Sequence, residues 1–81
     1  MITTDWARSN RKTEARLESD FTYHAPHGDQ AERYSEIRSA AKSLAELLIK
    51  YCPESRELSL SLANLEQAAF WANASIARNE P

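Results

Sequence analysis

The sequence has one glycine and one cysteine, and each scarcity excludes a class of protein. Gly28 alone cannot form a glycine-rich phosphate-binding loop, and so little glycine disfavours a β fold rich in hairpins. Cys52 alone cannot form an internal disulfide framework, and it suits a reducing compartment. The 81 residues make one small domain, which buries only a modest core unless a metal, a covalent staple or self-association supports it.

Strong charge of one sign and long apolar runs are also missing. Ten basic and twelve acidic side chains leave a net charge of -2, which argues against non-specific binding to duplex DNA or RNA. No apolar run approaches the roughly 20 residues of a membrane span, and the first residues, MITTDWARSNRKTEAR, lack the apolar centre of an export signal. We therefore expect no nucleic-acid duplex and no membrane as a partner, and no export.

The chain is organised around residues 55–79, which contain no glycine or proline and predict one helix of about seven turns. Its apolar residues form two stripes at helical spacing. The first stripe consists of Leu58, Leu62, Leu65, Ala69, Ala72 and Ile76, and the second of Leu60, Ala63, Phe70, Trp71 and Ala74. One stripe suffices to pack on one neighbour, so two stripes imply two neighbours. Because the rest of the chain is too short to cover both, the pattern predicts self-association.

Residues 29–52 predict a second, amphipathic helix. Asp29 and Glu32 have the spacing of a capping box at its start. Its apolar stripe recurs at intervals of three and four residues through Tyr34, Ile37, Ala41, Leu44, Leu48 and Tyr51. Pro53 ends or kinks this helix, and the next one starts at once, with Pro53 in its first turn or Ser55 as its N-cap. An antiparallel hairpin is favoured over one long kinked helix, because both stripes need a partner.

The first residues of the chain are polar and highly charged. Residues 1–20 predict a short helix near 5–18, with Trp6, Ala7 and Leu17 as its apolar anchors. The alternative is a tail that becomes ordered only against a partner copy.

Between these segments, residues 21–28, FTYHAPHG, predict an ordered, extended connector. Pro26 and Gly28 oppose helix formation, and the aromatic residues favour extended backbone. The expected fold class is therefore all-α, with a polar segment over 1–20 and an antiparallel helical hairpin over 21–81.

No set of residues predicts a catalytic centre. His24 and His27 have HxxH spacing but lack an evident third ligand, so we expect no metal and a structural role for His24. Cys52 beside a histidine could act as a nucleophile, but next to a proline at a helix end a cysteine is more often a small buried apolar group. The acidic residues lie on predicted solvated faces. We therefore expect no enzyme activity and no cofactor.

The remaining candidates suit recognition. Tyr23 offers a flat face on which a base could stack, a contact of about 1–3 kcal/mol per base. Arg38 and Lys42 stand one turn apart on the following helix and could contact phosphates. They could instead be surface cations that pair with Glu36 or Glu46, and spacing alone favours this second interpretation.

Three segments resemble a family of phage proteins. FTYHAP (21–26), RYSEIRSAAKSLAELL (33–48) and CPESRELSLSLANLEQAAFWANASIARN (52–79) are similar to the phage anti-CBASS protein of the second type. That family shares a helical hairpin domain with the first Thoeris anti-defence protein. The blocks YHAP, CPxSRE and FWANASIARN are specific in this order and at this spacing. The resemblance covers residues 21–79 and leaves residues 1–20 outside.

The resemblance implies a small all-helical protein that assembles into a homohexamer. Such proteins act as sponges in the cytoplasm of the infected bacterial host. They bind the cyclic oligonucleotides that immune cyclases make, without cleaving them, so that CBASS effectors are not activated. Cyclic dinucleotides lie in pockets between two protomers, and some members hold cyclic trinucleotides in separate pockets around a three-fold axis.

The resemblance also implies roles for individual residues. Tyr23 matches the aromatic residue that stacks on a cyclic dinucleotide base, and Arg38 matches the basic residue that faces its phosphates. Arg78 matches the basic residue of the trinucleotide pocket, although it also suits the negative end of a helix dipole. The small hydroxyl residue of that pocket aligns with Ser39 or with Ala40, and Ala40 would leave the pocket without its hydroxyl.

A two-fold interface presents each side chain twice. One Tyr23 and one Arg38 per chain therefore suffice for a ring with two bases and two phosphates. Helical spacing adds Lys42 to the same cyclic dinucleotide site.

Two other functions stay open. One is a helical hairpin adaptor whose second apolar stripe binds a protein partner. The other is an enzyme that degrades the same signals, and the lack of a metal or nucleophile cluster in the sequence counts against it.

Overall fold

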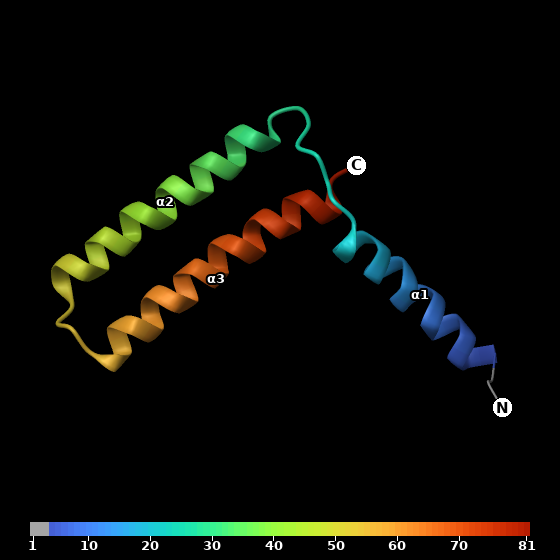
Figure 1. Ribbon diagram of the computed structural model, residues 1–81, viewed down its shortest axis with the longest axis horizontal. Coiled ribbons are helices and arrows are strands. Elements are labelled where there is room, and N and C mark those ends of the chain that lie inside the picture. Colours follow the sequence, from blue (N-terminus) through green and yellow to red (C-terminus); the bar gives the residue numbers. More distant parts are fainter. Residues whose placement is uncertain (1–3) are drawn as a thin grey trace.

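The computed structural model describes the backbone of residues 4–81 and the side chains of residues 12–81. This described backbone forms three helices and no strand: α1 (Thr4–Phe21), α2 (Gln30–Tyr51) and α3 (Arg56–Asn79) (Figure 1). The all-α fold class is thereby confirmed. No helix in the described part of the chain is long and apolar enough to cross a membrane.

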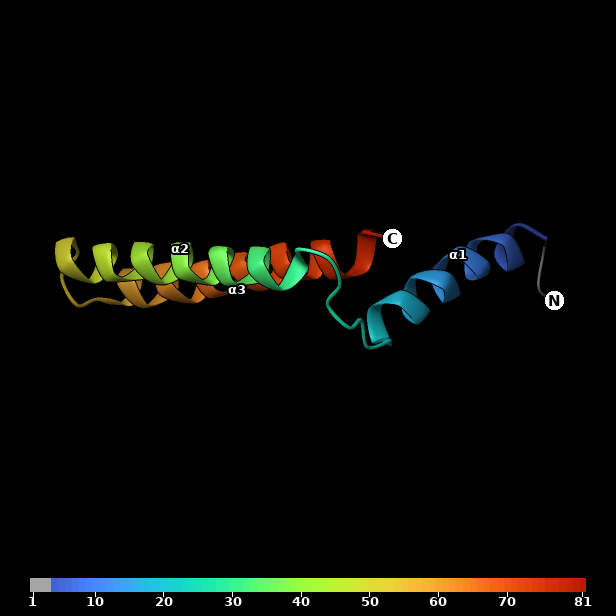
Figure 2. The same cartoon turned by 90° about the horizontal axis from the view of Figure 1, so that it is seen from above.

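The helices α2 and α3 lie side by side and run in opposite directions, as both views of the ribbon show (Figures 1 and 2). They contain 22 and 24 residues and so match in length. The chain reverses at 52–55, where Cys52 has the extended backbone (φ -105°, ψ 135°) that a residue before proline prefers. The predicted antiparallel hairpin is confirmed, and the alternative of one kinked helix is wrong.

Ser55 caps α3 at its N-terminus. Its backbone is extended, and its Oγ accepts a hydrogen bond from the Leu58 N–H at 3.1 Å. This bond satisfies one of the N–H groups that the start of a helix leaves without a partner. Pro53 lies outside α3, so the start at Ser55 is the one of the two predicted starts that is confirmed.

The predicted capping box at the start of α2 is wrong. Asp29 occupies the N-cap position, but its side chain makes no capping hydrogen bond. Its Oδ1 instead accepts a hydrogen bond from Arg33 Nε at 3.1 Å. Gln30 closes the turn, because its N–H donates to the His27 carbonyl at 3.1 Å while its Oε1 accepts from the His27 N–H at 3.1 Å. The Asp29 carboxylate thus pairs with Arg33, one turn further along α2, instead of capping the helix.

Residues 22–29 connect α1 to α2 without regular structure. Phe21 is the last residue of α1 and not, as predicted, the first residue of the connector, so the helix is longer than expected. Gly28 has a φ of 57°, in the left-handed region that glycine adopts without steric penalty. Trp6 and Ala7, the predicted anchors of the first helix, lie outside the described side chains.

No described hydrophobic side chain is buried. The first predicted stripe of α3 is half-buried at each of its positions, whereas the second is exposed except at Ala74. Large apolar side chains that are 45–70% exposed include Leu44, Leu47, Ile49 and Tyr51 of α2 and Leu60, Phe70 and Trp71 of α3. Packing between α2 and α3 therefore covers one stripe of α3 and leaves the other to solvent.

The molecule is flat and extended, and α1 projects away from the hairpin (Figures 1 and 2). The Cα radius of gyration is 18.2 Å, well above the value of about 12 Å for a compact domain of this length. The shortest of its three extents, 57 × 34 × 14 Å, is close to the diameter of a single helix. The chain thus forms one layer of helices with no second layer to cover it.

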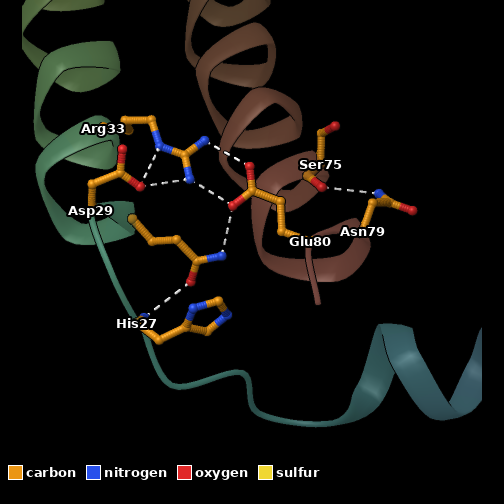
Figure 3. A network of polar contacts seen from close by, with 7 residues as sticks. His27, Asp29, Arg33, Ser75, Asn79 and Glu80 are labelled. Carbon is orange, nitrogen blue, oxygen red and sulfur yellow. Dashed lines mark hydrogen bonds and ion pairs between the residues drawn. The ribbon is translucent and has the colours of Figure 1, made fainter.

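Four polar side chains join the ends of the hairpin, and we call them the end clamp: Asp29, Gln30, Arg33 and Glu80 (Figure 3). Arg33 donates to both carboxylate oxygens of Glu80, from Nη1 to Oε2 at 2.7 Å and from Nη2 to Oε1 at 2.6 Å. Gln30, which is 3% exposed, donates from Nε2 to Glu80 Oε1 at 2.9 Å. Because Gln30 also holds the His27 N–H, the end clamp joins the start of α2, the end of α3 and the connector.

The end clamp changes the protonation of its own members. The hydrogen bonds from Arg33 and then from Gln30 lower the pKa of Glu80 from 4.5 to about 2. The same carboxylate raises the pKa of Arg33. A carboxyl group whose pKa is lower in the folded state stabilises the fold above its unfolded pKa. That contribution is lost as the pH falls through the folded pKa.

Ser55→Ala removes the cap of α3 and is expected to lower the free energy of unfolding by about 1 kcal/mol. Ser61→Ala, at an exposed position inside α3, is the matched control. It should leave stability unchanged or slightly higher, because alanine is the better helix former. Urea denaturation followed by circular dichroism at equal protein concentrations measures both variants. An equal loss at both serines would contradict the assignment of the cap.

Glu80→Gln keeps the shape of the side chain but removes the carboxylate from the end clamp. Above about pH 5 the variant should melt at a lower temperature than the parent protein, because Arg33 loses one of its two charged partners and keeps only Asp29. The difference should shrink as the pH falls from 4.5 toward about 2, where Glu80 of the parent becomes protonated. Glu54→Gln, in the exposed turn between α2 and α3, is the control. A melting difference that does not change with pH would argue against the end clamp.

Candidate functional site

Three of the predicted site residues line one hollow of about 360 Å³. Tyr23 belongs to the connector, Arg38 to α2 and Arg78 to the last turn of α3. Its lining residues come from the open end of the hairpin and from the connector. Figure 1 shows the connector passing beside the end of α3 there. Its other lining residues include Asp20, His24, Tyr34, Phe70 and Asn73. The fold therefore gathers an aromatic ring and two guanidinium groups from three separate segments.

Tyr23 is 84% exposed, so its ring is open to a ligand. The backbone that follows it is held at two points. His24 Nε2 donates to the Ser19 carbonyl at 2.7 Å. Further on, the His27 N–H donates to Gln30 of the end clamp (Figure 3). The structural role predicted for His24 is confirmed by this bond. Groups of three or more side chains that could hold a metal ion are absent from the described residues.

Two residues that line the hollow each have a buried polar atom without a hydrogen-bond partner. These atoms are the hydroxyl of Tyr34 on α2 and Oδ1 of Asn73 on α3. A buried polar group that stays unpaired costs roughly 1–3 kcal/mol, so such groups mark a place for a missing partner. The hydroxyl can donate or accept, and the amide oxygen accepts. The hollow thus offers hydrogen-bonding capacity in addition to a ring and two cations.

Arg78 is the most connected of the three site residues. Its guanidinium lies over the Trp71 ring, 5.8 Å from the centroid, and its Nε is 3.7 Å from Asp20 Oδ1. Its carbonyl accepts a hydrogen bond from Ser19 Oγ at 3.4 Å. Arg78 also lines a second hollow, of about 630 Å³, between α1 and α3, which includes Arg16. Arg78 therefore lines two hollows, and Asp20 at the end of α1 lines both of them as well.

Phe70 and Trp71 form an edge-to-face pair beside the site. Their ring centroids are 5.1 Å apart with an interplanar angle of 81°, and both rings are more than half exposed. Phe70 lines the hollow, and the Arg78 guanidinium lies over the Trp71 ring. The sequence predicted core or oligomer contacts for both, and the exposed aromatic area is well suited to such contacts.

The other predicted site residues lie apart from Tyr23. Lys42 lines a hollow of about 550 Å³ further along the hairpin, which it shares with Arg38 and which is lined mainly by apolar side chains. Ser39 and Ala40 are exposed on α2 and line neither of the hollows that contain Arg78. Arg38 is thus the cation common to the site and its apolar extension. The role of Ser39 in a trinucleotide pocket stays a prediction.

Tyr34, Asn73 and Asp20 were not predicted as site residues. Tyr34 was assigned to the apolar stripe of α2, and its ring does lie on that half-buried face. Asn73 follows Ala69 by one turn, so a polar residue on the covered face of α3 was the available signal. Asp20 lines the site because α1 ends beside α3. No pattern in the sequence predicts that α1 and α3 lie together there.

Comparison with protein families supports the sequence resemblance. The family model described as Acb2/Tad1, hairpin domain, matches residues 13–77. The match begins inside α1, so the expectation that all of residues 1–20 lie outside the family is wrong. Searches of curated proteins and of solved structures return no match. Because the family model covers well over half of the 81 residues, the chain belongs to the Acb2/Tad1 hairpin-domain family.

Proposed function

We propose that this protein binds cyclic oligonucleotide second messengers and sequesters them without cleaving them. Membership in the Acb2/Tad1 hairpin-domain family fits a role in phage anti-defence. The observation that carries the finer proposal is the meeting of Tyr23, Arg38 and Arg78 around one hollow. In the cytoplasm of an infected bacterial host, such binding would keep the messenger from activating CBASS effectors.

The chemistry of the hollow suits a ligand with bases and phosphates. The exposed ring of Tyr23 can stack on a base, a contact of about 1–3 kcal/mol. The guanidinium groups of Arg38 and Arg78 can each bind a phosphate through two parallel hydrogen bonds. A shift of the Tyr34 and Asn73 side chains toward the ligand would let their unpartnered atoms bond to base edges or ribose hydroxyls. Lys42, one turn beyond Arg38, adds a cation on the same helix.

The protomer offers half of a site. Its hollow of about 360 Å³ is near the lower end of the roughly 300–1,000 Å³ of ligand pockets and is open to solvent. Two copies related by a two-fold axis would present each side chain twice and would close the hollow. The exposed apolar faces of α2 and α3 would supply the interface. A homohexamer with dihedral symmetry would contain three such pairs, and its three-fold axis would bring Arg78 and Ser39 of three copies together around a cyclic trinucleotide.

An adaptor function is the alternative. The exposed apolar side chains of α2 and α3 would serve a different protein partner as well as a second copy. The two functions differ in what the protein retains. An adaptor would capture a protein and would hold no cyclic nucleotide.

Calorimetric titration against a panel of cyclic di- and trinucleotides tests the proposal. We expect tight binding of at least one ligand, followed by release of the intact ring when the complex is heat-denatured and chromatographed. A linear product would identify an enzyme instead. The absence of ligand binding, together with stable capture of a protein partner, would identify an adaptor.

Tyr23→Ala is expected to weaken cyclic dinucleotide binding about tenfold or more, because the stacking face is lost. Tyr23→Phe keeps that face and should stay within about twofold of the parent protein. Phe21→Ala, an equally drastic change at an aromatic residue of α1 that is also 84% exposed but does not line the hollow, is the matched control and should leave binding unchanged. Equal affinities of the Tyr23→Ala and Phe21→Ala variants would remove Tyr23 from the site.

A further inference from the structure

The carboxylate of Asp20 lies beside Arg78, one of the two arginines of the proposed site, and beside Arg16 of its own helix. Its Oδ1 lies 3.7 Å from Nε of Arg78, and its Oδ2 lies 3.7 Å from Nε of Arg16. The side chains of Asp20 and Arg78 are only 27% and 28% exposed, whereas that of Arg16 is 82% exposed. Asp20 thus stands between a cation of the hollow and a cation on its own helix.

We infer that Asp20 is an internal counter-ion that competes with ligand phosphate for Arg78 and so sets the affinity of the site. This inference rests on the proposed function, because it concerns the same hollow. It adds an affinity-determining residue that contacts the ligand-binding arginine and comes from α1.

An aromatic ring and a carboxylate already lie near the guanidinium of Arg78. The Trp71 ring covers one side of it, 5.8 Å from the ring centroid, so an anion must approach from the remaining sides. Asp20 lines the same hollow as Arg38 and Arg78, and a phosphate that enters must replace its carboxylate or lie beside it. Fixed charges of the same sign repel each other most strongly where water is partly excluded. The carboxylate therefore opposes the second phosphate of a ligand whose first phosphate is bound by Arg38.

Displacement of Asp20 is feasible because Arg16 offers it a second partner. Arg16 precedes Asp20 by one helical turn in α1, and its exposed guanidinium can keep the carboxylate neutralised when Arg78 binds phosphate. Asp20 also links α1 to the hairpin, together with the bond from Ser19 Oγ to the Arg78 carbonyl. A ligand that takes Arg78 would thus remove one of these two links.

The test compares Asp20→Asn with Glu18→Gln in the full chain. Each variant removes one negative charge near the end of α1, but Glu18 does not line the hollow. Calorimetric titration with cyclic di-AMP at low salt should show an affinity about three- to fivefold higher for Asp20→Asn and a change of less than about twofold for Glu18→Gln. In the Arg78→Gln background, Asp20→Asn should give no gain. Asp20→Ser repeats the comparison if circular dichroism shows that the asparagine variant is unfolded.

Unchanged or weaker binding by the Asp20 variants overturns the inference, and so does a gain that persists without Arg78. The same variants are titrated with inorganic pyrophosphate, which needs cations but no stacking. If no protein binds any cyclic nucleotide but Asp20→Asn binds pyrophosphate more tightly, the proposed function fails and the counter-ion stands. If no cyclic nucleotide binds and the variants do not differ in pyrophosphate binding, the proposed function and the counter-ion inference both fail.

Discussion

Two helices that pack only on each other can each cover one apolar stripe, and this constraint governs the rest of the structure. The seam between α2 and α3 leaves every described hydrophobic side chain at least partly exposed. The flat shape, 14 Å in its shortest extent, provides no second layer that could cover them. The hairpin is instead fixed at its ends, by the Ser55 cap at one and by the end clamp at the other. Its remaining apolar faces are available to other copies of the chain.

The same constraint decides what kind of site the protomer can build. A single layer of helices forms open hollows rather than enclosed cavities, so in the proposed assembly each protomer would supply a surface and a second copy would supply the cover. The end clamp matters here because it fixes the connector that carries Tyr23 against the helices that carry Arg38 and Arg78. Under this proposal, recognition and assembly would depend on the same interface between copies. Affinity would come from side chains that assembly has already ordered.

Most of the fold could be predicted from residue spacing, because helical periodicity and the signals of Pro53 and Ser55 are local. The two stripes of α3 were separated correctly. The predicted capping box at the start of α2 is wrong, because Asp29 pairs with Arg33 instead of capping the helix. The capping-box pattern does not take that arginine into account. Spacing also placed Lys42 near Arg38 but could not show that it faces the apolar extension of the site.

The site itself needed contacts between distant parts of the chain. Ser19 of α1 and Arg78 of α3 are hydrogen-bonded although they lie 59 positions apart in the sequence. No periodic pattern encodes such a contact. Sedimentation velocity of the ligand-free protein over a range of concentrations shows whether the hairpin self-associates. If the exposed apolar faces pair copies of the chain, we expect a discrete assembly at about six times the 9.2 kDa of the chain, stable on dilution. A folded, dispersed monomer at all concentrations would contradict this expectation.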